Sequence, residues 1–197
     1  AFFLVGAAIA PGSDLLLRHV GINPTRVGVL NILRLMGANI ELLNERQAGG
    51  EPVADLRVRH SRLRGIRVPV DQVPLAIDEF PALLIAAACA DGETVVSGAE
   101  ELRVKESDRI AAMAQGLARL GIGVRETPDG IVVRGGSLTG GEVDSLGDHR
   151  IAMSFAMAAL RATDTIRVRD CKNVDTSFPG FVALARAAGL DVTARRQ

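Results

Sequence analysis

Three apolar, alanine-rich runs recur along the chain and constrain its fold more than any other feature. Each has apolar residues on every side rather than along one stripe, and they occupy residues 2–10, 80–90 and 151–160. A helix that is apolar all round is stable only when other elements cover it completely. We therefore expect three helices in the interior of one molecule.

The same series of patterns follows each run. A β-branched segment typical of a strand comes first, at residues 15–20, 94–97 and 165–168. A segment with one apolar stripe, typical of a surface helix, comes next, at residues 25–36, 107–120 and 178–188. Gly37, Gly121 and Gly189 follow these helices and suit a left-handed helix cap. A short strand is expected after each glycine, at residues 39–42, 123–126 and 190–193.

This periodicity predicts one α/β domain of three repeats, because a unit that cannot bury its own apolar helix must stack on its neighbours. The predicted units are approximately residues 1–74, 75–147 and 148–197. The first two also carry a predicted hairpin, formed by residues 55–59 with 66–69 and by residues 131–134 with 142–144. The third unit lacks these two strands, so we expect another segment of the native protein to cover its open edges.

Composition excludes several classes of protein. The chain has 23 basic and 23 acidic residues and lacks Trp and Tyr, which argues against nucleic acid as a partner. Its two cysteines show neither disulfide nor metal-ligand spacing, so a reducing cytoplasmic location is expected. The apolar start is too short to span a membrane and has no initiator Met. We expect the sequence to begin inside a longer protein.

Charged residues gather just before three of the predicted helices, at residues 77–81, 103–109 and 147–150. Helix N-termini attract anions through free backbone N–H groups and the helix dipole. If these ends converge, Lys105, Arg109 and Arg150 would bind phosphate and carboxylate groups, while Asp78 and Glu106 would form an acid–base pair. Sequence alone does not settle the protonation of the two carboxylates.

Purely structural interpretations stand beside this one. The charges around Arg109 could pair with one another on a solvated surface, and Asp78 and Asp148 could be ordinary helix caps. An arginine-rich segment at residues 56–67 alternates with apolar residues, as the wet face of a half-buried sheet does. Its alternative role is a noncatalytic module that binds an acidic partner or RNA.

Four motifs, in order along nearly the whole chain, resemble those of the 5-enolpyruvylshikimate-3-phosphate synthase family. They are Ile77-Asp-Glu-Phe-Pro, Leu102-Arg-Val-Lys-Glu-Ser-Asp-Arg, Asp148-His-Arg-Ile-Ala-Met and Thr176-Ser-Phe-Pro. Their wording is most similar to the glyphosate-tolerant bacterial branch. The related UDP-N-acetylglucosamine enolpyruvyl transferases share the expected fold and donor but not the second motif, so they are the second enzyme hypothesis.

The resemblance implies a two-domain enzyme whose active site lies between the domains. This chain resembles the C-terminal domain, an inside-out α/β barrel in which sheets surround buried helices, and the N-terminal domain is its missing partner. The family transfers the enolpyruvyl group of phosphoenolpyruvate to the 5-hydroxyl of shikimate 3-phosphate, with no metal or organic cofactor. We expect this chain alone to be inactive, because half of the substrate contacts are absent.

The resemblance also implies roles for individual residues. Asp78 matches the aspartate at the target hydroxyl, and Glu106 matches the glutamate that exchanges a proton with the methylene carbon. Arg109 and Arg150 match the arginines that bind phosphoenolpyruvate, with Lys105 beside the pair. Two positions depart from the family: Thr176 replaces a common lysine, whose charge Lys172 could supply, and Glu101 replaces an asparagine.

Overall fold

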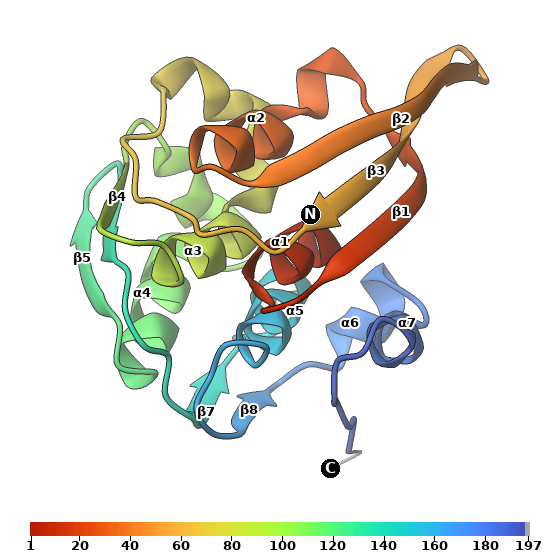
Figure 1. Cartoon of the computed structure of the whole chain (residues 1–197). Helices are drawn as coiled ribbons and strands as arrows, with labels where there is room; N and C mark the ends of the chain where they lie inside the picture. Colours follow the sequence, from red (N-terminus) through yellow and green to blue (C-terminus); the bar gives the residue numbers. More distant parts are fainter. Residues whose placement is uncertain (196–197) are drawn as a thin grey trace.

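The three apolar runs form the centre of the molecule in the computed structural model, which describes residues 1–195 (Figure 1). They are helices α1 (Phe2–Ile9), α3 (Phe80–Ala88) and α5 (His149–Ala158), and each contacts the other two. Every residue of α3 is buried. The prediction of three interior helices is therefore confirmed.

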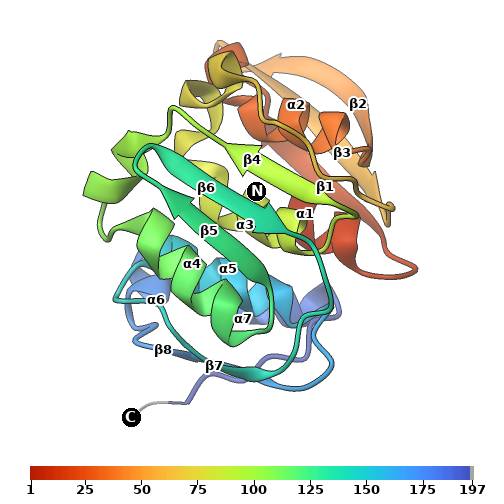
Figure 2. The ribbon, with the colours of Figure 1, turned by 90° about the vertical axis from the view of Figure 1, so that its left-hand side faces the viewer.

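Sheets cover these helices from outside. The first contains β1 (Asp14–Gly21), β2 (Asn39–Ala48) and β3 (Glu51–Arg59), all antiparallel, in the order β1-β3-β2. The second contains β4 (Glu93–Val96), β5 (Gly123–Thr127) and β6 (Gly130–Arg134) in the order β4-β6-β5, and Figure 2 looks onto it. The third pairs β7 (Gly141–Asp144) with β8 (Ile166–Arg169). Among residues 1–195 the sheets surround the helices but remain separate and do not close into a continuous barrel.

The first predicted hairpin is wrong. Residues 55–59 lie in β3, which pairs with β1 and β2, and Gly49 and Gly50 form the tight turn from β2 with φ of 59° and 85°. The second half of β2 is polar and mostly exposed, so it lacks the alternation of apolar and polar residues that would have predicted a strand there. Residues 63–68 instead run parallel to β4, where the Val68 N–H donates to the carbonyl of Val95 at 2.9 Å.

The second predicted hairpin is also wrong, since β6 pairs with β4 and β5 while β7 pairs in parallel with β8. Both errors have one cause: the segment that ends one unit crosses to the sheet of the next. Alternation along a strand shows which face is buried but does not identify its partner. The strand predicted at residues 190–193 does not form, although Leu190 packs into the core.

Surface helices follow the strands, as the apolar stripes predict. They are α2 (Gly28–Leu35), α4 (Arg109–Arg119) and α7 (Phe181–Ala187), with α6 (Asn173–Ser177) before α7. Short 3-10 turns precede several elements, at η1 (Pro24–Arg26), η2 (Val70–Gln72), η3 (Pro74–Glu79) and η4 (Glu100–Val104). The predicted glycine caps at positions 37, 121 and 189 have φ of 95°, 84° and 97°, which confirms their left-handed conformation. No helix within residues 1–195 combines the length and the apolar composition that crossing a bilayer requires.

Candidate active site

The three charged segments that lie far apart in the sequence meet at one end of the helical core. Asp78 lies in η3 just before α3, Arg109 is the first residue of α4, and Asp148 precedes α5. Asp108 caps α4 by accepting from the Ala111 N–H at 2.9 Å. The Asp148 carboxylate likewise caps α5 by accepting from the Arg150 N–H at 2.9 Å. The alternative interpretation of Asp148 as a helix cap is thus confirmed.

Arg109 joins these segments. Its Nε donates to Asp148 Oδ2 at 2.8 Å, its Nη1 donates to Asp78 Oδ1 at 3.2 Å, and its Nη2 donates to Glu106 Oε2. The Arg109 side chain is only 1% exposed, whereas those of Asp78 and Glu106 are 48% and 55% exposed. A buried guanidinium therefore presents two carboxylates to solvent.

Lys105 and Arg150 complete the cluster on its exposed side. Lys105 Nζ lies 3.6 Å from Asp78 Oδ1 and also contacts the Glu101 carboxylate. Arg150 Nη1 donates to the Asp78 carbonyl at 3.0 Å and to Glu79 Oε1 at 3.3 Å. The structure thus brings together all the residues for which the sequence analysis expected an active-site role: Asp78, Lys105, Glu106, Arg109 and Arg150.

The cations around Asp78 determine its ionisation. Burial by itself would raise the pKa of Asp78, but Arg150, Lys105 and Arg109 outweigh it and hold the pKa below its usual range. The hydrogen bond to Glu101 is the main cause of a raised pKa at Lys105, and the charge of Asp78 adds to it. Asp78 is therefore an ionised carboxylate facing a charged lysine at neutral pH.

Asp78 is not the cap of α3, which was its alternative interpretation. Glu79 occupies the position before α3, and the Asp78 carboxylate faces Arg109.

Arg103 makes two contacts beside the cluster that the sequence analysis did not expect. Arg103 joins η4 to the start of α4 by donating to Asp108 Oδ2 at 2.8 Å, and to the end of β5 by donating to the Thr127 carbonyl at 2.7 Å. Neither contact has a signal in sequence spacing, because each joins segments from different elements.

The arginine-rich face of the first sheet is balanced by carboxylates on the same face. Arg57 donates to both oxygens of Asp14 at 2.8 and 2.6 Å, and Arg59 donates to Glu41 at 2.6 Å. These pairs neutralise the charges that an acidic partner or RNA would need. The structure supports the half-buried-sheet interpretation for residues 56–59, which lie in β3, whereas residues 63–68 run beside β4.

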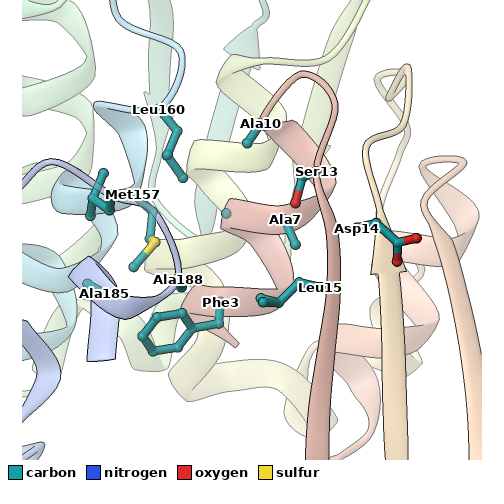
Figure 3. Close-up of a pocket in the computed structure, with 12 residues that line it drawn as sticks. Phe3, Ala7, Ala10, Ser13, Asp14, Leu15, Met157, Leu160, Ala185 and Ala188 are labelled. Carbon is teal, nitrogen blue, oxygen red and sulfur yellow. The ribbon is translucent and has the colours of Figure 1, made fainter. Parts of the chain in front are cut away.

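An apolar cavity lies elsewhere in the molecule. It has a volume of about 210 Å³ and lies between α1, the start of β1, α5 and α7. Figure 3 shows Phe3, Leu15, Met157 and Leu160 around it. None of the charged residues that join at Arg109 lines the cavity. Within residues 1–195, no three His, Cys, Asp or Glu side chains are placed to share a metal ion.

Comparison with known proteins places this arrangement in a family. The family model for EPSP synthase (3-phosphoshikimate 1-carboxyvinyltransferase) matches residues 1–184. The chain belongs to the EPSP synthase family. The 3-phosphoshikimate 1-carboxyvinyltransferase of Methylococcus capsulatus is 71% identical over 192 residues, which cover 98% of this chain and 44% of that protein. The enzyme of the same name from Nitrosococcus oceani is 66% identical and is covered over 43% of its length.

Solved structures agree with the sequence comparison. An EPSP synthase of Acinetobacter baumannii superposes with a TM-score of 0.97 at 55% identity, over 99% of this chain and 46% of that one. The enolpyruvyl transferase NikO of Streptomyces tendae has a TM-score of 0.69 at 18% identity, which shows a shared fold only. The chain therefore spans less than half the length of the EPSP synthases that it matches.

Proposed function

We propose that this chain is the C-terminal domain of a 3-phosphoshikimate 1-carboxyvinyltransferase. The whole enzyme would transfer the enolpyruvyl group of phosphoenolpyruvate to the 5-hydroxyl of shikimate 3-phosphate. The observation that carries this proposal is the assembly of Asp78 and Glu106 on Arg109, beside Lys105 and Arg150. Family membership and the match to named enzymes support the same reaction.

The cations suit the donor substrate. Phosphoenolpyruvate carries a phosphate and a carboxylate, and guanidinium groups bind both in a fixed, bidentate geometry. The Arg150 side chain is 26% exposed and Lys105 is 22% exposed, so both can meet an incoming anion. Because Arg109 is nearly inaccessible, the anion reaches it only if an exposed partner such as Glu106 moves aside.

The carboxylates suit the proton transfers. Addition requires that the 5-hydroxyl lose a proton as its oxygen bonds to the donor, while the methylene carbon gains one. The resulting tetrahedral adduct then loses a methyl proton and expels phosphate. The lowered pKa of Asp78 keeps its carboxylate ionised at neutral pH, so we assign Asp78 to accept the proton of the hydroxyl. Glu106, joined to the same guanidinium, is the group that we assign to the methylene carbon, and Lys105 would stabilise the charges that develop.

We also propose that the three repeats act as one domain and that an N-terminal domain completes the active site. Within residues 1–195, β1 has a hydrogen-bonded strand partner only in β3 and β8 only in β7, so each leaves an edge that another strand can join. The apolar cavity beside β1 adds surface for such a strand. Two free cysteines fit a cytoplasmic enzyme. We assign the chain to the glyphosate-tolerant branch on the wording of its motifs alone.

Complementation tests the proposed reaction. The chain is co-expressed with the N-terminal part of the Methylococcus capsulatus relative in a bacterial strain that lacks the enzyme and requires aromatic amino acids. We expect growth without these amino acids from the natural sequence, and no growth with Asp78→Asn or Glu106→Gln. Asp164→Asn is the matched control, because the exposed Asp164 carboxylate accepts from the neighbouring Thr165 N–H. Growth of both site variants at the control rate would contradict the assigned chemistry.

A further inference from the structure

The two carboxylate oxygens of Asp148 have different partners: one caps helix α5 and the other binds Arg109. Oδ1 accepts the Arg150 N–H at 2.9 Å and so caps α5, whereas Oδ2 accepts Arg109 Nε at 2.8 Å and the Ser107 hydroxyl at 3.1 Å. The Asp148 side chain is fully buried, as is that of Arg109. Capping α5 requires only Oδ1. The bonds that Oδ2 accepts from Arg109 and Ser107 therefore point to a second role for Asp148.

The shape of the Arg109 guanidinium explains this second role. The group is planar and rigid, so a bond at Nε fixes the directions of both terminal nitrogens. Those nitrogens hold Asp78 and Glu106. Asp78 and Glu106 are about half exposed and belong to other segments, whereas Asp148 is enclosed and attached to the start of α5. The rigid end of the network is therefore Asp148.

We propose that Asp148 is a positioning residue that orients Arg109 and, through it, sets the spacing of Asp78 and Glu106. This inference rests on the proposed function, in which those two carboxylates carry the proton transfers. Because the Asp148 side chain is fully enclosed, it acts through the buried bond to Arg109 Nε. A misplacement of about 1 Å at a reacting group lowers the rate by about a hundredfold.

The substitution Asp148→Asn distinguishes the proposed positioning role of Asp148 from its role as a helix cap. Asn is as good a helix cap as Asp, so Asp148→Asn keeps an oxygen for the Arg150 N–H. Its amide nitrogen then faces Arg109 Nε, and two donors cannot bond. The expected result in the complete enzyme, assembled from both halves, is a fall in kcat of about a hundredfold with a native circular dichroism spectrum. Asp164→Asn, which alters an exposed aspartate beyond the far end of α5, is expected to retain the natural kcat.

A double-substitution cycle distinguishes positioning from a general structural effect. If Asp148 acts through Arg109, Asp148→Asn combined with Arg109→Lys lowers kcat/KM no further than Arg109→Lys alone. Losses that multiply, or a kcat of Asp148→Asn within twofold of the natural enzyme, would overturn the proposal. If Asp148→Asn does not fold, Asp148→Ser, another capping residue, is judged by the same criteria. Failure of both to fold would also overturn it, because Asp148 would then serve the fold.

The failure of this inference is distinct from failure of the proposed function. An active natural enzyme that loses activity with Asp78→Asn and Glu106→Gln, but keeps it with Asp148→Asn, refutes positioning alone. An assembled enzyme that folds yet shows no transfer from phosphoenolpyruvate, even with the natural sequence, refutes the proposed function itself.

Discussion

Gly116 lets α4, which begins with Arg109, pack closely against α5, which carries Arg150, and replacing it by alanine tests this packing. A Cβ atom at position 116 would lie 2.2 Å from Cζ of Phe155, whose side chain is fully buried. An ordinary contact begins near 3.4 Å, so the ring or the helix must shift by at least 1.2 Å. Because the Phe155 side chain is fully buried, such a shift must displace other core residues.

The magnitude follows from two opposing effects. Overpacking a filled core destabilises by about 1–3 kcal/mol, and the 2.2 Å approach to the Phe155 ring places this site in the upper part of that range, at about 2–3 kcal/mol. Alanine in place of a helical glycine stabilises by about 1 kcal/mol. We expect a net destabilisation of about 1–2 kcal/mol for Gly116→Ala. For a chain of this length that lowers Tm by about 2–8 °C, measured by circular dichroism or differential scanning calorimetry.

Gly6→Ala in α1 is the matched control, because Gly6 is also a buried helical glycine. Its new Cβ would lie 2.9 Å from Sδ of Met157, the flexible part of a side chain that can repack. We expect Gly6→Ala to leave Tm within about 3 °C of the natural chain. A Gly116→Ala variant that melts no lower than Gly6→Ala would refute the packing argument.

Two further predictions concern titrating groups. Burial alone would raise the pKa of Asp148, but its bonds with Arg109 prevail and lower the pKa below the ordinary 3.8. The ionised carboxylate therefore stabilises the fold above about pH 4, and this stabilisation is lost as the pH falls further, so the Tm values of the natural chain and Asp148→Asn should converge in acid. Burial raises the pKa of Cys89 to about 11, so at pH 8 about one thiol in a thousand is ionised. Iodoacetamide should modify the exposed Cys171 well before Cys89, and equal rates measured by mass spectrometry would contradict the burial of Cys89.

Much of the secondary structure was predictable because its causes are local. An alanine-rich apolar run implies a covered helix, and a glycine after an apolar stripe implies a left-handed cap; Phe80–Ala88 and Gly121 illustrate the two. Strand pairing was not predictable in the same way. Residues 63–68 pair with β4, and β7 pairs with β8, across distances in sequence that alternation does not encode.

Residue types and helix signals are local, so the position of each charged segment before a helix follows from the amino-acid sequence alone. The enclosure of Arg109, and the sharing of its guanidinium by Asp78, Glu106 and Asp148, exist only once the chain has folded. An arginine among charged neighbours in the sequence is usually exposed to solvent. Its burial here is stable because carboxylates from separate segments satisfy all three nitrogens, and that condition arises only when the helices pack together.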